Sequence, residues 1–153
     1  MKLLELIRSQ LIVPRLAAAE KFAAIRELVD FMAAGGAFPA PAREPVLGAV
    51  YGRERFMSTG MEHGIALPHG VSEAVDDEVA AIGLSPQGIP FDSFDGRPAQ
   101  IVILLVTPTQ KAITRVRTLA EIARVVNERR VREALVKAET VEQAVDVLRG
   151  SAG

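Results

Sequence analysis

Residues 101–106 read Ile-Val-Ile-Leu-Leu-Val, a continuous run of β-branched and aliphatic side chains. A strand with one buried face alternates apolar and polar residues. An uninterrupted apolar run of this length is instead typical of a central strand that is covered on both faces. Thr107 and Pro108 close the run. The sequence therefore predicts a sheet with this strand in its interior.

Three shorter apolar segments, at residues 11–13, 64–68 and 79–84, are the other strand candidates. The first stops at Pro14 and the second ends in Pro68, and a residue without an N–H donor suits a strand end or edge. Residues 71–78 are acidic and polar and are expected to form a surface loop. Residues 85–98 contain three prolines and are expected to form a turn-rich excursion, in which Ile89 and Phe91 could make a small added strand.

Helices are predicted wherever apolar residues recur every three or four positions. The pattern is long at residues 17–34, ends at Gly35 and Gly36, and returns at residues 2–9, 46–56 and 113–127. In the last of these, one apolar face carries Val116, Leu119, Ile122, Ala123 and Val126. A short helix around Val131 and Leu135 and a final one opened by the Thr140/Gln143 capping box follow. This order indicates the α/β class, with helices on both faces of a mixed sheet. The predicted core comprises Phe22, Leu28, Ile65, Leu67, Ile82, Ile103, Leu105, Leu119 and Ile122.

Length and composition limit the function classes. The 153 residues predict one domain, residues 1–153, and the 18 basic against 19 acidic side chains give no electrostatic case for a nucleic-acid partner or an anionic membrane surface. Cysteine is absent, which excludes disulfides, thiolate metal sites and cysteine nucleophiles. No apolar run approaches the roughly 20 residues that span a bilayer. Glu5 and Arg8 break the apolar start, so we expect a cytoplasmic protein without a signal peptide.

Both histidines lie in one stretch, residues 63–70, which reads HGIALPHG. His69 is expected at the carboxyl end of a buried strand, where open α/β sheets place ligand-binding groups. Pro68 stiffens the approach to it, and Gly70 lets a phosphate or another backbone come close. A neutral imidazole is a good nucleophile near pH 7, and one ring nitrogen could attack phosphorus while the other donates to a carbonyl. The alternative interpretation is a structural histidine that is hydrogen-bonded at a strand end.

The longer stretch at residues 53–70, RERFMSTGMEHGIALPHG, resembles the active-site segment of a known family. This family comprises the IIA components of the fructose, mannitol and nitrogen-regulatory branch of the bacterial phosphoenolpyruvate-dependent phosphotransferase system. The resemblance continues at residues 88–92 (GIPFD) and at the Leu119–Ala120 pair, so it covers nearly the whole chain. It implies a single three-layer α/β/α domain with a small mixed β-sheet.

By this resemblance His69 is the phosphoryl acceptor, and no cofactor or metal is implied. It would take phosphate from the histidine phosphocarrier protein and pass it to a IIB component for sugar transport. Arg53 matches an arginine that the family places near the histidine, and its guanidinium suits phosphate oxygens, although it could be a solvated helix-end arginine. Thr59 would donate a hydroxyl hydrogen bond to phosphate or only cap a turn. Backbone N–H groups around Gly70 would cradle the anion.

Three positions depart from the family. Many relatives carry a second histidine where this chain has Arg115, which cannot orient His69 by accepting a hydrogen bond but can hold a fixed positive charge near phosphate. Glu62 replaces a small residue and would repel phosphate. His63 replaces an asparagine and is either a polar, phosphate-binding neighbour of the site or a solvent-facing turn residue. Arg115 is expected to be an anion clamp, with a plain surface charge as the alternative.

Two other functions stay open. The chain could be a regulatory, nitrogen-type or degenerate module that acts by binding partner proteins. It could also hold a metal on His63, His69 and Glu62 or Glu73, although two histidines six residues apart that straddle a strand do not form a standard ligand pattern. Neither nucleic-acid binding nor membrane insertion is expected.

Overall fold

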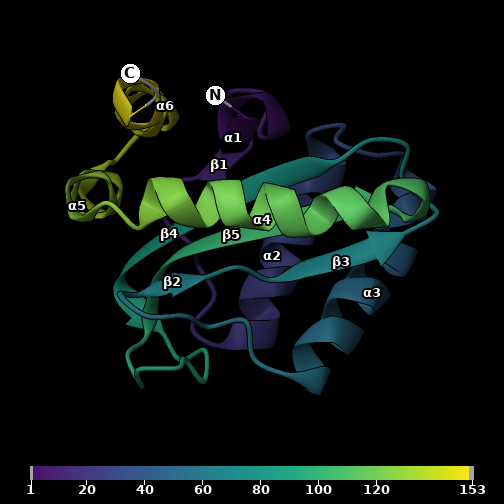
Figure 1. Ribbon diagram of the computed structural model, residues 1–153, viewed down its shortest axis with the longest axis horizontal. Helices are drawn as coiled ribbons and strands as arrows, with labels where there is room; N and C mark the ends of the chain where they lie inside the picture. The colour runs from purple at the N-terminus through teal and green to yellow at the C-terminus, as the bar shows by residue number, and fades with distance from the viewer. Residues whose placement is uncertain (1, 152–153) are drawn as a thin grey trace.

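The computed structural model describes residues 2–151, in which five strands form one mixed sheet between two layers of helices (Figure 1). The sheet order is β1–β4–β5–β2. β3 pairs with the same side of β5 as β2 does, further along that strand. The strands are β1 (Ile12–Val13), β2 (Ile65–Ala66), β3 (His69–Ser72), β4 (Val79–Ile89) and β5 (Ala99–Pro108). β4 and β5 are antiparallel and the other pairs are parallel, which confirms the mixed sheet.

The helices divide between the two faces of the sheet. The helices are α1 (Lys2–Leu6), α2 (Lys21–Ala34), α3 (Arg43–Phe56), α4 (Ala112–Val126), α5 (Arg129–Lys137) and α6 (Val141–Ser151), with short 3₁₀ turns at Ala40–Ala42 and Thr109–Lys111. α2 and α3 pack together behind the sheet, whereas α4 crosses its front beside α1, α5 and α6 (Figure 1). The predicted α/β/α arrangement is confirmed. No helix within residues 2–151 is long and apolar enough to cross a membrane.

β5 lies inside the sheet, with β4 on one side and β2 and β3 on the other. Its ten residues are buried apart from the half-buried Gln100, because helices cover both faces. This confirms the interpretation of residues 101–106. Most of the predicted core is buried as well, whereas Phe22 and Leu119 are half-buried at the edges of the helical layers.

Several predicted boundaries are wrong. The long helix begins at Lys21 rather than at residue 17, because the Glu20 carboxylate accepts from the backbone N–H groups of Phe22 and Ala23 and starts the helix there. Residues 85–89 continue β4 across an irregularity in its register instead of leaving the sheet. Residues 71–78 are not wholly a surface loop, since Ser72 ends β3 and Val75 is buried.

The predicted apolar face of α4 is only partly buried, since Leu119 and Ala123 are half-buried. Val116 is 67% exposed, whereas Thr118, Ile122 and Val126 are buried. The buried stripe advances every four residues and begins at a polar side chain, which an apolar pattern does not detect. Thr118 is accommodated because its hydroxyl donates to Glu78, which also accepts from Thr107 on β5.

Candidate functional site

His69 is the first residue of β3, whereas the sequence predicted it at the carboxyl end of the preceding strand. Pro68 has no N–H, so the pairing of this part of the chain with β5 is interrupted between β2 and β3. The carbonyl of Pro68 still accepts from the Leu105 backbone N–H at 3.0 Å, and His69 then pairs with Leu105. The histidine therefore lies just after the interruption between β2 and β3, where pairing with β5 resumes, and its side chain is half-buried.

The imidazole of His69 is oriented by the backbone. Its Nδ1 lies 2.9 Å from the carbonyl oxygen of Leu67. A carbonyl can only accept, so this hydrogen bond places the ring proton on Nδ1. In the neutral ring, Nε2 then carries the free lone pair and is the nucleophilic nitrogen.

Burial lowers the pKa of His69 below its usual value, and the positive charges of Arg53 and Arg115 lower the pKa further. The Leu67 hydrogen bond and the negative charge of Glu54 act in the opposite direction without reversing the shift. The neutral, nucleophilic form is therefore the main species at pH 7.

The two arginines that lower the His69 pKa belong to opposite layers of the fold. Arg53 is in the last turn of α3 behind the sheet, and its Nη1 donates to the carbonyl of Met57 at 2.6 Å. Arg115 is in the first turns of α4 in front of the sheet and is half-buried. Both charges act on the same imidazole, so the fold brings together three residues that are far apart along the chain. Two guanidinium groups beside a neutral nucleophile favour an anionic reactant.

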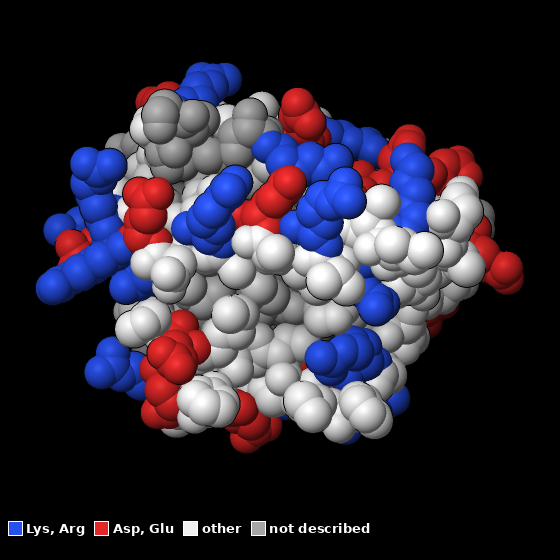
Figure 2. Space-filling view, in the orientation of Figure 1, with Lys and Arg blue, Asp and Glu red and all other residues white. Residues whose placement is uncertain are grey.

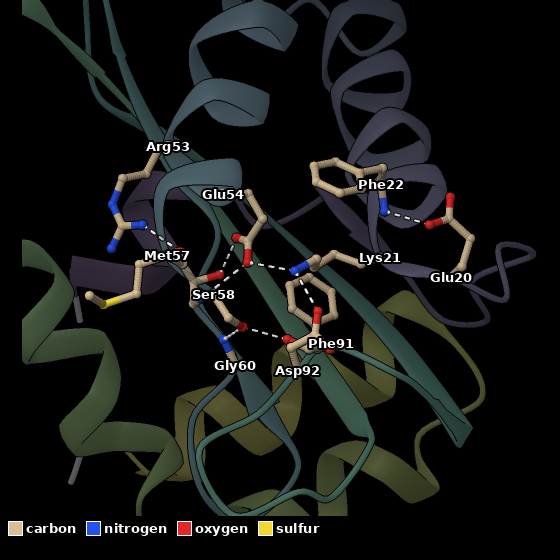
Figure 3. A network of polar contacts seen from close by, with 11 residues as sticks. Glu20, Lys21, Phe22, Arg53, Glu54, Met57, Ser58, Gly60, Phe91 and Asp92 are labelled. Atoms are coloured by element: carbon tan, nitrogen blue, oxygen red, sulfur yellow. Dashed lines mark hydrogen bonds and ion pairs between the residues drawn. The ribbon is translucent and has the colours of Figure 1, made fainter.

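Thr59 is buried and its hydroxyl hydrogen is already donated. Thr59 Oγ1 donates to Glu54 Oε1 at 2.6 Å, and the Thr59 backbone N–H donates to Glu54 Oε2 at 2.8 Å (Figure 3). The Glu54 side chain is completely buried, and Lys21 Nζ lies 3.6 Å from Oε2. In this arrangement Thr59 holds a carboxylate, and the hydroxyl has only its lone pairs left for other partners.

Gly70 permits a close approach between β3 and α3. A Cβ at this position would lie 3.0 Å from the Val50 backbone nitrogen and 3.1 Å from the Ala49 carbonyl carbon. Of the two neighbours that the sequence allowed beside this glycine, a phosphate or another backbone, the structure shows the backbone of α3. This close packing holds β3, the strand that begins with His69, against α3.

His63 lies in an exposed turn and adopts a left-handed backbone conformation with φ of 65°. Its backbone N–H donates to Asp95 at 3.0 Å, and its Nε2 lies 3.7 Å from the exposed Glu62 carboxylate. Within residues 2–151 no three His, Asp or Glu side chains are grouped closely enough to hold a metal ion. The His63, His69 and glutamate set of the metal hypothesis is therefore not assembled.

Two features of the site were not identified from the sequence. Lys21 reaches Glu54 from the first turn of α2, and no local pattern connects these two residues. In addition, large apolar side chains that are close in sequence to Arg53 and Arg115 are exposed. They are Phe56, Met57, Ile113 and Val116. On the face that carries α4, basic and acidic side chains alternate along the helix, and a few basic side chains stand on the largely uncharged surface beside it (Figure 2). Exposed apolar groups beside an anion-attracting centre are typical of a surface that binds another protein.

The chain is similar to known proteins along most of its length. The family description "Phosphoenolpyruvate-dependent sugar phosphotransferase system, EIIA 2" matches residues 5–150. A fructose-specific EIIA component of Haloferax volcanii is 32% identical over 130 residues, which cover 85% of this chain and 83% of that protein. A nitrogen regulatory protein of Escherichia coli is 30% identical over 111 residues, which cover 71% and 67%. The Bacillus subtilis fructose-specific EIIABC component is 28% identical over 148 residues, and these cover 97% of this chain but only 23% of that longer protein.

Solved structures show the same fold. The nitrogen regulatory protein IIA-Ntr of Neisseria meningitidis has a TM-score of 0.83 at 22% identity, with 94% of this chain and 97% of that chain covered. The E. coli IIA mannitol enzyme, in complex with phosphorylated IIB mannitol, has a TM-score of 0.76 at 22% identity, with 92% and 94% covered. The match to the family description extends over nearly all of the sequence and includes the His69 segment. The chain belongs to the EIIA type 2 family of the phosphoenolpyruvate-dependent sugar phosphotransferase system.

Proposed function

We propose that this chain carries a phosphoryl group on Nε2 of His69. The observation that carries the proposal is the geometry of the imidazole: Nδ1 is tied to the Leu67 carbonyl, so Nε2 is left with its lone pair. Arg53 and Arg115 supply positive charge from the two helical layers. Positioning and charge stabilisation are what phosphoryl transfer chiefly requires from a protein.

The transfer step follows from the protonation state. The Nε2 lone pair forms a bond to phosphorus while the bond between phosphorus and the donor nitrogen breaks, and the donor keeps that electron pair. No proton needs to leave His69, because Nδ1–H remains bonded to the Leu67 carbonyl as positive charge develops on the ring. The arginines stabilise the oxygens of the transferring group. Passing phosphate onward reverses these changes.

The proposed partners are a histidine phosphocarrier protein as donor and a IIB component as acceptor. Family membership supports the pair, and the related IIA mannitol enzyme has been solved with phosphorylated IIB. The exposed Phe56, Met57, Ile113 and Val116 support docking of a protein around the site. In this proposal Arg115 acts as an anion clamp where many relatives carry histidine.

A regulatory role is the second candidate, because nitrogen regulatory proteins are as similar to this chain as sugar-specific components are. In that role the phosphorylated and unphosphorylated chains bind a target protein with different affinities. Phosphoryl transfer to a IIB component supports transport, whereas target binding that depends on phosphorylation, without such transfer, supports regulation.

The experiment that tests the carrier function is phosphorylation with phosphoenolpyruvate, the initiating enzyme and the phosphocarrier protein. We expect an acid-labile phosphate on the wild type and on His63→Ala, and none on His69→Ala. His63→Ala is a matched control, since it removes the other imidazole of the chain. A wild-type chain that takes no phosphate would leave only a degenerate binding module.

A further inference from the structure

A continuous set of polar contacts connects the N-terminal turn of α2 to the imidazole of His69. It begins at Lys21, whose Nζ lies 3.0 Å from Asp92 Oδ2 and 3.6 Å from the buried carboxylate of Glu54. It continues from Glu54 to the backbone N–H and hydroxyl of Thr59 (Figure 3). The first half of the connection therefore fixes residue 59 from one side.

The second half runs through two backbone carbonyls. The carbonyl of Thr59 accepts from the Leu67 backbone N–H at 3.1 Å. The carbonyl of Leu67 in turn accepts from His69 Nδ1 at 2.9 Å. Since the N–H and the C=O of Leu67 are both engaged, the orientation of the acceptor for the imidazole depends on where Thr59 is held.

The neighbouring contacts hold residues 57–60 from other directions. Arg53 binds the Met57 carbonyl at 2.6 Å, and Ser58 Oγ donates to the Phe91 carbonyl and accepts from the Gly60 N–H. Among the described hydrogen bonds of residues 57–60, the bond from Leu67 N–H to the Thr59 carbonyl leads directly to Leu67 and so to His69. Both oxygens of Glu54 accept hydrogen bonds in a site without exposed side-chain surface, and a buried carboxylate is retained only when it is paired and hydrogen-bonded. Such a group is expensive to reposition, so it is a rigid anchor.

We propose that Glu54 is a positioning residue for the His69 imidazole. It acts through the Thr59–Leu67 backbone hydrogen bond, which aims the Leu67 carbonyl at Nδ1 and leaves Nε2 unprotonated. This inference deepens the proposed function, on which its importance for transfer rests. In this assignment Thr59 links Glu54 to Leu67 through hydrogen bonds, and its hydroxyl hydrogen binds Glu54 rather than phosphate.

The test is the tautomer of His69 in the unphosphorylated chain, read from long-range ¹H–¹⁵N NMR spectra of the two ring nitrogens. In the wild type we expect the proton on Nδ1. Thr59→Val keeps the shape of the side chain and the backbone N–H bond to Glu54 but removes the hydroxyl donor to Glu54 Oε1. Nε2–H should therefore gain population, and the phosphorylation rate should fall about tenfold, the size of one lost hydrogen bond to a charged group. Thr59→Ser should restore both.

Thr118→Val is the matched control, because Thr118 is equally buried and donates to another carboxylate, Glu78, outside this connection. It should leave the His69 tautomer unchanged. If Thr59→Val does not fold, Glu54→Gln serves instead: it keeps the shape but removes the charge, and the same shift in smaller degree is expected.

An unchanged tautomer in folded Thr59→Val or Glu54→Gln overturns the inference. The tautomer is measured without any phosphoryl donor, so its outcome is independent of the carrier function. If the wild-type chain takes no phosphate while Thr59→Val still shifts the tautomer, the proposed function alone is contradicted.

Discussion

The two histidines of this chain are six positions apart and have opposite environments. His69 is half-buried, donates from Nδ1 to Leu67 and lies under the influence of two arginines. His63 is exposed in a left-handed turn beside Glu62. The same side chain thus becomes a nucleophile candidate in one place and a surface group in the other. Burial, one backbone carbonyl and two charges make the difference.

Reversing the charge beside His69 should have the largest effect on this difference. Arg53→Glu places a carboxylate where phosphate oxygens must approach, and we expect the phosphorylation rate to fall by about 100-fold, the usual cost of losing one charge-stabilising donor. Arg129→Glu, in the exposed first turn of α5, is the control and should change the rate less than twofold. The rates are measured by quenching the reaction at set times and counting the phosphate incorporated. Equal losses of rate in Arg53→Glu and Arg129→Glu would contradict the placement of Arg53 in the phosphoryl site.

The packing under His69 can be broken separately from its chemistry. Gly70→Ala pushes a Cβ against the α3 backbone at 3.0 Å, and we expect a loss of about 3 kcal/mol in the free energy of unfolding. Gly48→Ala, in the exposed middle of α3 with open space around it, should instead stabilise by about 1 kcal/mol. Urea unfolding of both variants checks this, and similar midpoints would show that β3 and α3 are not in close contact.

The smallest expected effect is a change in the pH at which His69 titrates. Burial lowers the pKa of His69, and Arg53 and Arg115 add to the shift. The neutral form therefore increases as pH rises through a midpoint below 6.5, and the transfer rate should rise over the same range and then level off. Arg115→Gln removes one positive charge and should move the midpoint upward. A midpoint above 6.5 in the wild type, measured by NMR titration, would contradict the environment described for His69.

The sequence predicted what depends on local pattern. The apolar run at residues 101–106 identified the interior strand, and the segment at residues 53–70 singled out His69 and Arg53 as candidates for the site. Contacts between distant elements were not predictable in this way. Lys21 comes to Glu54 only when α2 and α3 pack side by side, and Thr118 is buried only because Glu78 accepts its hydroxyl. Pro68 was read as the end of a strand because its missing N–H is visible in the sequence, whereas its paired carbonyl is not.

The central claim is that Nε2 of His69 holds the phosphoryl group. The most direct measurement is NMR of the phosphorylated, ¹⁵N-labelled chain, in which coupling between phosphorus and a ring nitrogen identifies the bonded atom. We predict that the coupling appears at Nε2 of His69 and that Nδ1 keeps its proton. Phosphorus on Nδ1, on His63 or on any other residue would contradict the account.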